Sequence, residues 1–314
     1  MKKLLLIFLS ITLFTACENE PLDLGFIDES ENNNGNGTGD ELNYFLSSFN
    51  AILDTTLPFF GQTITNATIN YNQLGVPLIT NTATTTIGIT INTTSTVTVN
   101  SENYITEVNT TLDNDSSLSD VQTFTYDASN RLISSTYNNI ESDDEDYSYT
   151  FTYNGFEITR TEQNTGAITI FMLNSENQLI SQTTTQNGIE TSSEIFQYNS
   201  EGNCISGTYS VDGTTITRGF VYDTYTNPLY IMNQSLYPNS TYPPIGILDN
   251  DLNSQLSTSL SISGSRNVIA QVINGTIYNH EVTYDSNNRI LTNKIFISDE
   301  GVEISENHTF NYVN

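Results

Sequence analysis

The sequence predicts a mainly β protein, with one large twisted antiparallel or barrel-like sheet built from repeated hairpins and one amphipathic helix before it. Three observations support this fold class. A strand–turn–strand unit recurs along the chain. Residues from about 61 onward are rich in Thr, Ile and Val, with two-residue alternation. Only one long stretch, at about residues 40–57, has the apolar spacing of a helix.

The N-terminus has the layout of a secretory signal peptide. Lys2 and Lys3 precede an apolar run from Leu4 to Leu13, and small residues lead directly to Cys17. The run is too short to span a bilayer as a mature helix. The order resembles a bacterial lipoprotein signal, in which the cysteine becomes the lipid-modified first residue. The alternative is an ordinary signal peptide with a chance cysteine. We expect residues 1–16 to be removed and Cys17 to carry the lipid.

The residues after Cys17 suggest where the protein is displayed. The acidic sequence "ENE" at 18–20 resembles the tag that sends Bacteroidetes-type lipoproteins to the outside of the outer membrane. The following Gly/Asn-rich run has almost nothing apolar to bury, so residues 17–39 are predicted to be a flexible tether. We therefore expect a membrane partner through the lipid, cell-surface exposure, and a single domain over residues 40–314.

The chain is strongly acidic. It has 36 acidic and 8 basic residues and a formal charge of −28, which becomes about −30 once both signal-peptide lysines are removed. Such a surface repels nucleic acid and anionic membrane, so no nucleic-acid partner is expected. Negative charge also keeps an Asn- and Thr-rich β protein soluble, which is the simplest explanation for it.

The predicted helix covers about residues 40–57. Asp40 is a suitable N-cap, and Pro58 would end the helix. Apolar residues follow the helical spacing between them at Leu42, Phe45, Leu46, Phe49, Ile52 and Leu53. We expect this apolar stripe to dock on the sheet rather than bind a partner.

The repeat is clearest in "FTYDASNRLIS", which begins at Phe124. The unit returns at identical spacing as "FMLNSENQLIS" from Phe171, "FQYNSEGNCIS" from Phe196 and "VTYDSNNRILT" from Val282. Two looser copies begin at Ile69 and Phe220, and a shortened one begins at Phe151. The two aromatic positions share one face of a strand, the Asp or Asn starts a turn, and an apolar residue begins the partner strand.

The sequences "YDASNRL" and "YDSNNRI" resemble the YD repeat of RHS-type proteins. The whole arrangement is more similar to uncharacterised Bacteroidetes lipoproteins, in which YD-like hairpins follow a lipid-anchored N-terminus and form one large, porin-like twisted sheet. That resemblance implies the fold and no catalytic residues. Cys204 stands at the apolar position of one repeat, so we interpret it as a small core residue rather than a reactive thiol.

Catalytic and zinc motifs are sparse. His280 and His308 are the two histidines, neither has a neighbouring nucleophile motif, and no ligand-spaced His/Cys set is present. We therefore expect no enzyme activity and no catalytic residue, with a hydrolase as the third hypothesis for function.

Three acidic clusters are the remaining candidates for a metal site. Their carboxylates are Asp113, Asp115 and Asp120, then Asp143, Asp144 and Asp146, and then Asp249 and Asp251. Alternating oxygen ligands can hold calcium, but none of the clusters has the EF-hand pattern. Solvated hairpin-tip loops are the favoured interpretation and calcium is the alternative; no other cofactor is expected.

The predicted function is a surface-anchored lipoprotein with a non-catalytic binding or structural role. The alternative is an accessory protein that captures a glycan or peptide for nutrient uptake, using tyrosines exposed on a broad sheet. The stronger interpretation of the repeat Phe and Tyr residues is that they are internal. If a site exists, we expect it in the non-repeating insert at 233–265 or in the acidic hairpin tips.

Overall fold

The computed structural model describes residues 44–57, 61–73, 75–113, 115–139, 146–211, 213–236, 245–249, 256–299 and 302–313. Over these residues it contains one 19-stranded antiparallel sheet and three short helices. The predicted signal peptide, Cys17 and the tether lie outside the described residues.

The strands are β1 Leu46–Leu57, β2 Gly61–Tyr71, β3 Pro77–Thr86, β4 Ile89–Val99, β5 Ile105–Leu112, β6 Asp115–Tyr126, β7 Leu132–Asn139, β8 Tyr147–Asn154, β9 Glu157–Glu162, β10 Ile168–Leu173, β11 Leu179–Gln186, β12 Ile189–Tyr198, β13 Cys204–Val211, β14 Thr214–Thr226, β15 Arg266–Ile273, β16 Thr276–Asn279, β17 Glu281–Tyr284, β18 Ile290–Asp299 and β19 Val302–Tyr312. The helices are α1 Pro228–Leu236, α2 Ile245–Leu248 and α3 Leu256–Ile262.

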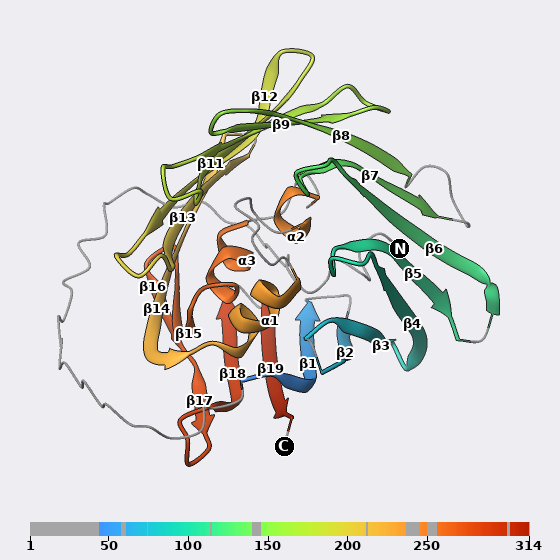
Figure 1. The fold of residues 1–314 in the computed structure, drawn as a ribbon. Helices are drawn as coiled ribbons and strands as arrows, with labels where there is room; N and C mark the ends of the chain where they lie inside the picture. The colour runs from blue at the N-terminus through green and yellow to red at the C-terminus, as the bar shows by residue number, and fades with distance from the viewer. Residues whose placement is uncertain are drawn as a thin grey trace, which may run out of the picture.

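The sheet is nearly closed and barrel-like, because consecutive strands pair with one another and β1 pairs with both β2 and β19 (Figure 1). This order of pairing is interrupted at one place, between β16 and β17. β16 pairs with β15, and β17, which follows after His280 alone, pairs with β18. The chain at 276–284 therefore joins the two ladders by changing partner at His280.

The predicted strand–turn–strand geometry is present at the repeats. In the first, Asp127 Oδ1 accepts hydrogen bonds from Ser129 N at 2.8 Å and Arg131 N at 3.0 Å. Asn130 adopts a positive φ of 59°, and Leu132 then begins β7 with 4% exposure. The aspartate nucleates the turn, and asparagine tolerates the left-handed backbone that closes it.

A further copy of the unit lies at 97–105, in "VTVNSENYI". The sequence analysis did not identify it, because Val97 and Val99 stand at the two positions that are aromatic in the first copy. Asn100 Oδ1 accepts hydrogen bonds from Glu102 N and Tyr104 N, as the aspartate does in the first repeat. Asn103 has a φ of 67° at the position equivalent to Asn130. The turn chemistry is therefore shared even where the aromatic residues are missing.

The repeat tyrosines tie neighbouring repeats together. Tyr126 Oη donates a hydrogen bond to the carbonyl oxygen of Ile105 at 2.7 Å, the first apolar residue of the preceding repeat. The same donation joins Tyr153 to Leu132, Tyr198 to Leu179, Tyr222 to Cys204 and Tyr312 to Ile290. This explains a tyrosine at a position where phenylalanine would fill space equally well, since the hydroxyl finds a backbone acceptor.

The predicted N-terminal helix is wrong. Residues 46–57 form β1, which lies between β19 and β2 and gains ladder hydrogen bonds on both sides. A register shift between Leu46 and Ser48 turns both Leu46 and Phe49 toward the core, at 0% and 7% exposure. Such a bulge adds one residue to a strand, so an inward pair three residues apart has the spacing of a helical stripe.

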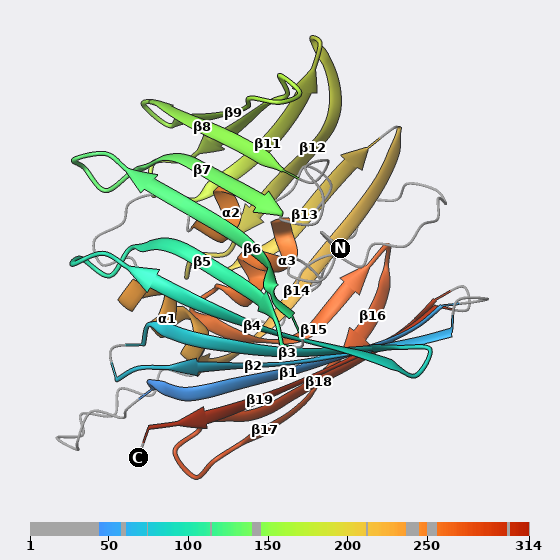
Figure 2. The ribbon, with the colours of Figure 1, turned by 90° about the vertical axis from the view of Figure 1, so that its right-hand side faces the viewer.

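The three helices lie within the curve of the sheet (Figures 1 and 2). Met232 of α1 packs in one buried cluster with Leu46, Phe49, Ala51, Ile290 and Phe310. Ile247, Leu248 and Leu256 of α2 and α3 pack in another, with Phe124, Leu132, Tyr149, Phe151, Ile158, Phe171, Leu173, Leu179, Phe196 and Cys204. The insert between β14 and β15 therefore fills the interior with its described helices.

Candidate functional site

The candidate site is a cavity at the strand junction of His280. It has a volume of about 40 Å³ and is lined by residues of β15, β18, β19, the junction and the flanks of the insert. Its polar lining is Asn227, Asn267, Gln271, His280, Asn293, Glu306 and His308; its apolar lining is Leu229, Ile262, Val268, Ile290, Ile295 and Phe310. This space holds roughly three water molecules, at 10–15 Å³ for each.

His280 stands where the chain changes partner. Its backbone nitrogen donates to the carbonyl oxygen of Ile269 at 2.9 Å, and its Nδ1 lies 2.6 Å from Asn293 Oδ1. Asn293 Nδ2 in turn donates to the carbonyl oxygen of Val268 at 3.0 Å, so Asn293 links β18 to β15 across the junction. His280 Nε2 is buried and has no hydrogen-bond partner among the described residues. Burial lowers the pKa of His280 to about 4, so the imidazole is neutral at pH 7.

His308 and Glu306 face the same cavity from β19. His308 Nε2 lies 3.8 Å from Glu306 Oε2, and the imidazole packs against the ring of Phe49 at 5.3 Å. Burial lowers the pKa of His308 to about 4 and raises the pKa of Glu306 above its usual range. The charge of Arg218 on β14 partly offsets the effect on Glu306. Both histidines of the chain therefore line one partly open cavity of mixed polar and apolar character, which the sequence analysis did not predict.

The chemistry available to this cavity is hydrogen bonding. Its described lining offers amides, imidazoles and one carboxylate, with no serine, threonine or cysteine to serve as a nucleophile. Among the described residues, no group of three or more His, Cys, Asp or Glu side chains is arranged to hold a metal ion. An arrangement of this kind joins strands through hydrogen bonds and leaves room for water.

Two buried carboxylates hold the insert inside the sheet. Glu194 on β12 is fully buried and accepts hydrogen bonds from Leu256 N at 2.7 Å and Ser257 N at 3.2 Å, at the start of α3. Burial raises the pKa of Glu194, opposed by these bonds and by the charge of Arg218. Gly207 on β13 permits the close approach, because an added Cβ would lie 2.3 Å from Ser257 Cβ.

Asp249, at the end of α2, is the second buried carboxylate and is 8% exposed. It accepts hydrogen bonds from Ser135, Gln122 and Tyr147, the last at 2.8 Å. Burial raises the pKa of Asp249 to about 6, opposed by these hydrogen bonds and by the charge of Arg160. The prediction of a solvated loop is wrong for this residue. Its carboxylate points toward the 19-stranded sheet, here called the wall, and joins the insert to that wall.

Arg160 secures the same end of the insert. This buried side chain on β9 donates to the carbonyl oxygen of Leu248 at 2.9 Å and lies 4.5 Å from the centre of the Tyr149 ring. A guanidinium can cap the C-terminal carbonyls of a helix and stack on aromatic faces at once. Neither Arg160 nor Glu194 lay in a motif that singled it out, and each is recognisable only from the fold.

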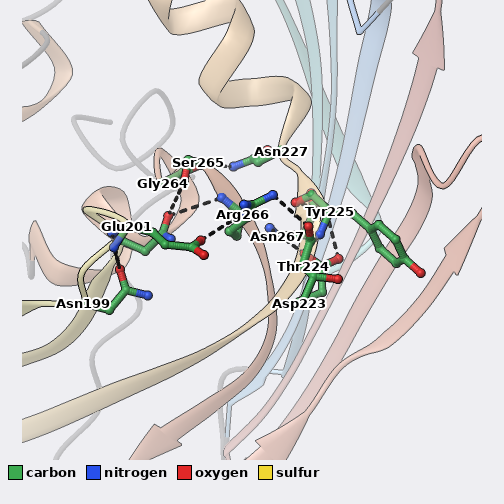
Figure 3. A network of polar contacts seen from close by, with 11 residues as sticks. Asn199, Glu201, Asp223, Thr224, Tyr225, Asn227, Gly264, Ser265, Arg266 and Asn267 are labelled. Carbon is green, nitrogen blue, oxygen red and sulfur yellow. Dashed lines mark hydrogen bonds and ion pairs between the residues drawn. The ribbon is translucent and has the colours of Figure 1, made fainter. Parts of the chain in front are cut away.

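The neck of the insert is a polar clamp (Figure 3). Where the chain leaves β14, Asn227 Nδ2 donates to the carbonyl oxygens of Ile262 and Gly264, which precede β15. Arg266 bonds Glu201 at 2.8 Å and the Thr224 carbonyl oxygen at 2.7 Å. Further bonds join Asp223 to Asn267, Tyr225 and Tyr284. The two ends of the insert are thus held together.

The other calcium candidates that the structure describes do not form a group of three or more metal-ligating side chains. Asp113 and Asp115 are exposed at the β5–β6 turn, and Asp113 accepts a hydrogen bond from Thr94. Asp120 lies farther along β6, and Asp146 accepts a hydrogen bond from Asn139 N at 2.7 Å. Asp143, Asp144 and Asp251 lie outside the described residues, so calcium binding there stays a prediction.

Cys204 and the aromatic residues follow the predicted structural roles. Cys204 is a free cysteine with 1% exposure, and burial raises the pKa of its thiol to about 12. None of the described tyrosines is exposed. The interpretation of Cys204 as a core residue is confirmed, and so is the internal position of the repeat aromatics.

Comparisons with known proteins give similar solved structures, of which two are described below. No protein-family model matches the chain, and no curated protein matches it in sequence. A porin-like protein from Bacteroides uniformis is 12% identical, with a TM-score of 0.46, covering 87% of this chain and 98% of that one. A porin-like protein from Bacteroides vulgatus is 9% identical, with a TM-score of 0.28, covering 86% and 98%. Functional proposals therefore rest on this chain's own residues.

No helix in the part of the chain that the structure describes has the length and hydropathy to cross a membrane.

Proposed function

We propose that this protein is a lipoprotein held at the outer-membrane surface through Cys17, with a non-catalytic binding or structural role. The observation that carries the proposal is the distribution of side chains across the wall. The repeat phenylalanines face the insert inside together with buried polar residues, whereas hydroxyl residues are frequent on the outward face, beside single exposed apolar residues such as Ile133 and Ile195. That distribution suits a filled β structure surrounded by water and attached to the membrane by a separate anchor.

The outward face can be followed across four strands. Thr125, Ser134, Thr150 and Thr161 are neighbours in one row from β6 to β9. On the opposite face, Phe151, Arg160, Thr169 and Thr184 form a row of buried residues from β8 to β11. A lipid-facing band requires apolar residues at the outward positions, so the hydroxyl row supports contact with water.

The anchor is tested by replacing Cys17 with serine. We expect the wild-type chain to fractionate with membranes and the Cys17→Ser variant to be released in soluble form. Replacement of Cys204 with serine is the matched control, since the buried thiol has no part in anchoring. Membrane retention of the Cys17→Ser variant equal to that of the wild type would contradict the proposal.

Surface display needs a separate measurement. Protease added to intact cells is expected to digest the wild-type protein, with a periplasmic protein as the protected control. Full protection of this chain on intact cells, followed by digestion after lysis, would place it on the periplasmic side.

A channel role is tested in planar bilayers. The buried contacts of α2 and α3 with the wall support an occupied interior. We therefore expect no conductance steps from the purified protein. Reproducible steps that persist across preparations would contradict this proposal and favour a pore.

The alternative functions have less support. Capture of a glycan or peptide by exposed tyrosines has no support among the described residues, because the repeat tyrosines donate their hydroxyl protons to carbonyls of the sheet. A hydrolase could use His308 beside Glu306, but the described lining of that cavity provides no nucleophile. We therefore propose neither.

A further inference from the structure

One sector of the wall is free of charge. The chain carries 36 acidic residues in total, yet none of the 47 residues from Thr55 to Ser101 is Asp, Glu, Lys or Arg. This stretch includes all of β2, β3 and β4, which are adjacent in the sheet. In a protein of net charge −28, this sector can contact an apolar surface without the desolvation that the charged side chains of the acidic hairpins would require.

The hairpin between β3 and β4 ends in an unusual tip. Thr86 pairs with Ile89, so Ile87 and Gly88 form a two-residue turn, and the Thr85 and Thr90 hydroxyls hydrogen-bond at 2.8 Å below it. Ile87 has a φ of 51°. Among the described residues it is the single positive-φ position that is neither glycine nor asparagine. A β-branched side chain is disfavoured in this left-handed region, because its Cβ crowds the backbone.

Other two-residue hairpins place asparagine or glycine at the first turn position, and Gly155 of the Gly155–Phe156 turn has a φ of 61° there. Asn187–Gly188 and Asn274–Gly275 close theirs with an asparagine at φ 53° and 46°. At the β3–β4 tip, by contrast, Ile87 is 80% exposed and Ile89 is 69% exposed. The tip therefore combines backbone strain with two exposed apolar side chains, where asparagine would avoid both costs. Strain of this kind concentrates where a segment has a functional contact.

We propose that the Ile87–Ile89 hairpin inserts into the electrically neutral lipid surface of the membrane to which the chain is tethered, as a second contact beside the lipid. This inference rests on the proposed lipid anchor. The tip is convex and offers only two large side chains. Specific protein interfaces bury about 1,200–2,000 Å² of total surface, whereas a lipid surface requires no complementary shape.

The energy of the contact fits a tethered role. Burial of the two isoleucines stabilises the inserted state only modestly, which is too weak to hold a free protein on a membrane. An anchored chain already lies at a high effective concentration near the lipid, so a weak contact can be well populated.

The chain is long enough to bring the tip to the membrane. Strand alternation places the β3–β4 tip at the rim opposite to Phe45, whose carbonyl oxygen accepts a hydrogen bond from Val313 N. β4 has 11 residues and spans about 36 Å. The 27 residue steps from Cys17 to Tyr44 reach up to about 90 Å when fully extended. The domain can therefore lie with this rim against the bilayer.

The absence of tryptophan from the chain provides a specific test. The lipidated Ile89→Trp variant, reconstituted into phosphatidylcholine vesicles, carries a single reporter at the tip. We expect its emission to shift to the blue relative to the soluble Cys17→Ser, Ile89→Trp double variant, and to be quenched by lipids brominated in their acyl chains. Ile189→Trp is the matched control, because Ile189 is 70% exposed in a hairpin that also carries Glu190. We expect no quenching there.

A second variant separates insertion from folding. Ile87→Asn in the Ile89→Trp background should leave the unfolding midpoint unchanged or higher, because it relieves the backbone strain, and should reduce the quenching several-fold. Retention on vesicles with no quenching of Ile89→Trp would overturn the inference, and a tip that binds a protein instead would give this result. Loss of the chain from the vesicles would instead contradict the lipid anchor.

Discussion

The hairpins of the wall are closed by contacts between residues close in sequence, whereas the insert is held by contacts between residues far apart in sequence. In the wall, Asp127 bonds the side chain of Arg131, four residues away, and each turn closes on its own sequence neighbours. In the insert, Asp249 is held by Ser135 and Gln122, 114 and 127 residues away, and Leu256 is held by Glu194, 62 residues away. Repeated local rules thus specify the wall, and single buried polar groups position the insert within it.

The largest predicted effect is a loss of stability when the core shared by the sheet and the insert is disrupted. Phe171 on β10 has 0% exposure and lies in the buried cluster that includes α2 and α3. Phe171→Ala should lower the free energy of unfolding by about 3–5 kcal/mol, because it removes the transfer energy and leaves a cavity. Urea unfolding measures this, with Phe156→Ala, at a 51% exposed position, as the control. Equal losses from the two variants would show that the interior is not packed as described.

The second predicted effect concerns only the attachment of the insert to the wall. Glu194→Ala should cost about 3 kcal/mol, because it leaves the amides of Leu256 and Ser257 buried without acceptors. Exposed Glu190 on the same strand is the matched control, and Glu190→Ala should change stability by less than about 0.5 kcal/mol. A neutral result for Glu194→Ala would mean that the carboxylate does not hold α3.

The lowered pKa of His308 in the junction cavity predicts that the free energy of unfolding depends on pH. The pKa of His308 is lowered to about 4 in the fold, so the unfolded chain binds more protons below pH 6.5. The stabilising contribution of His308 is therefore complete above pH 6.5 and falls by about 3 kcal/mol as the pH drops to 4. The raised pKa values of Glu306 and Asp249 act in the opposite direction.

The pH effect is measured as a difference between two chains. Unfolding of wild type and of His308→Gln from pH 7.5 to 4 isolates the histidine, since the acids are common to both. We expect the wild type to lose more stability than the variant below pH 6.5. Parallel profiles would contradict the buried, neutral state of His308.

The smallest effect concerns the bonds between repeats. Tyr126→Phe removes the hydroxyl that donates to the Ile105 carbonyl oxygen and keeps the ring. We expect a loss of about 1 kcal/mol. Tyr198→Phe should cost a similar amount, since its hydroxyl makes the equivalent bond to Leu179. Thermal or urea unfolding of both variants checks this, and no change in either would show that the tyrosine bonds do not stabilise the wall.

The range of the contacts explains what could be predicted from the sequence. The hairpins were predictable because Asp127, Asn130 and Leu132 act within one turn, and Cys204 was assigned to the core from its place in the unit. The copy at Val97 was missed because its strand lacks the aromatic pair that identified the others.

The errors came from contacts that no short stretch encodes. The helix predicted over residues 40–57 failed because a bulge mimics helical spacing, and because β1 completes the sheet between β19 and β2. Asp249 was assigned to a solvated loop because its neighbours are polar, yet its partners come from β6, β7 and β8. The meeting of His280 and His308 likewise depends on the closure of the sheet.

Amide hydrogen exchange over the insert tests most directly the claim that it is fixed inside the wall. We predict that the amides of Leu256 and Ser257 are protected as strongly as those of the neighbouring strand β13, and that Glu194→Ala accelerates exchange in α3 while leaving β13 unchanged. Exchange of α3 at the rate of an unstructured peptide, with the strands still protected, would contradict the account.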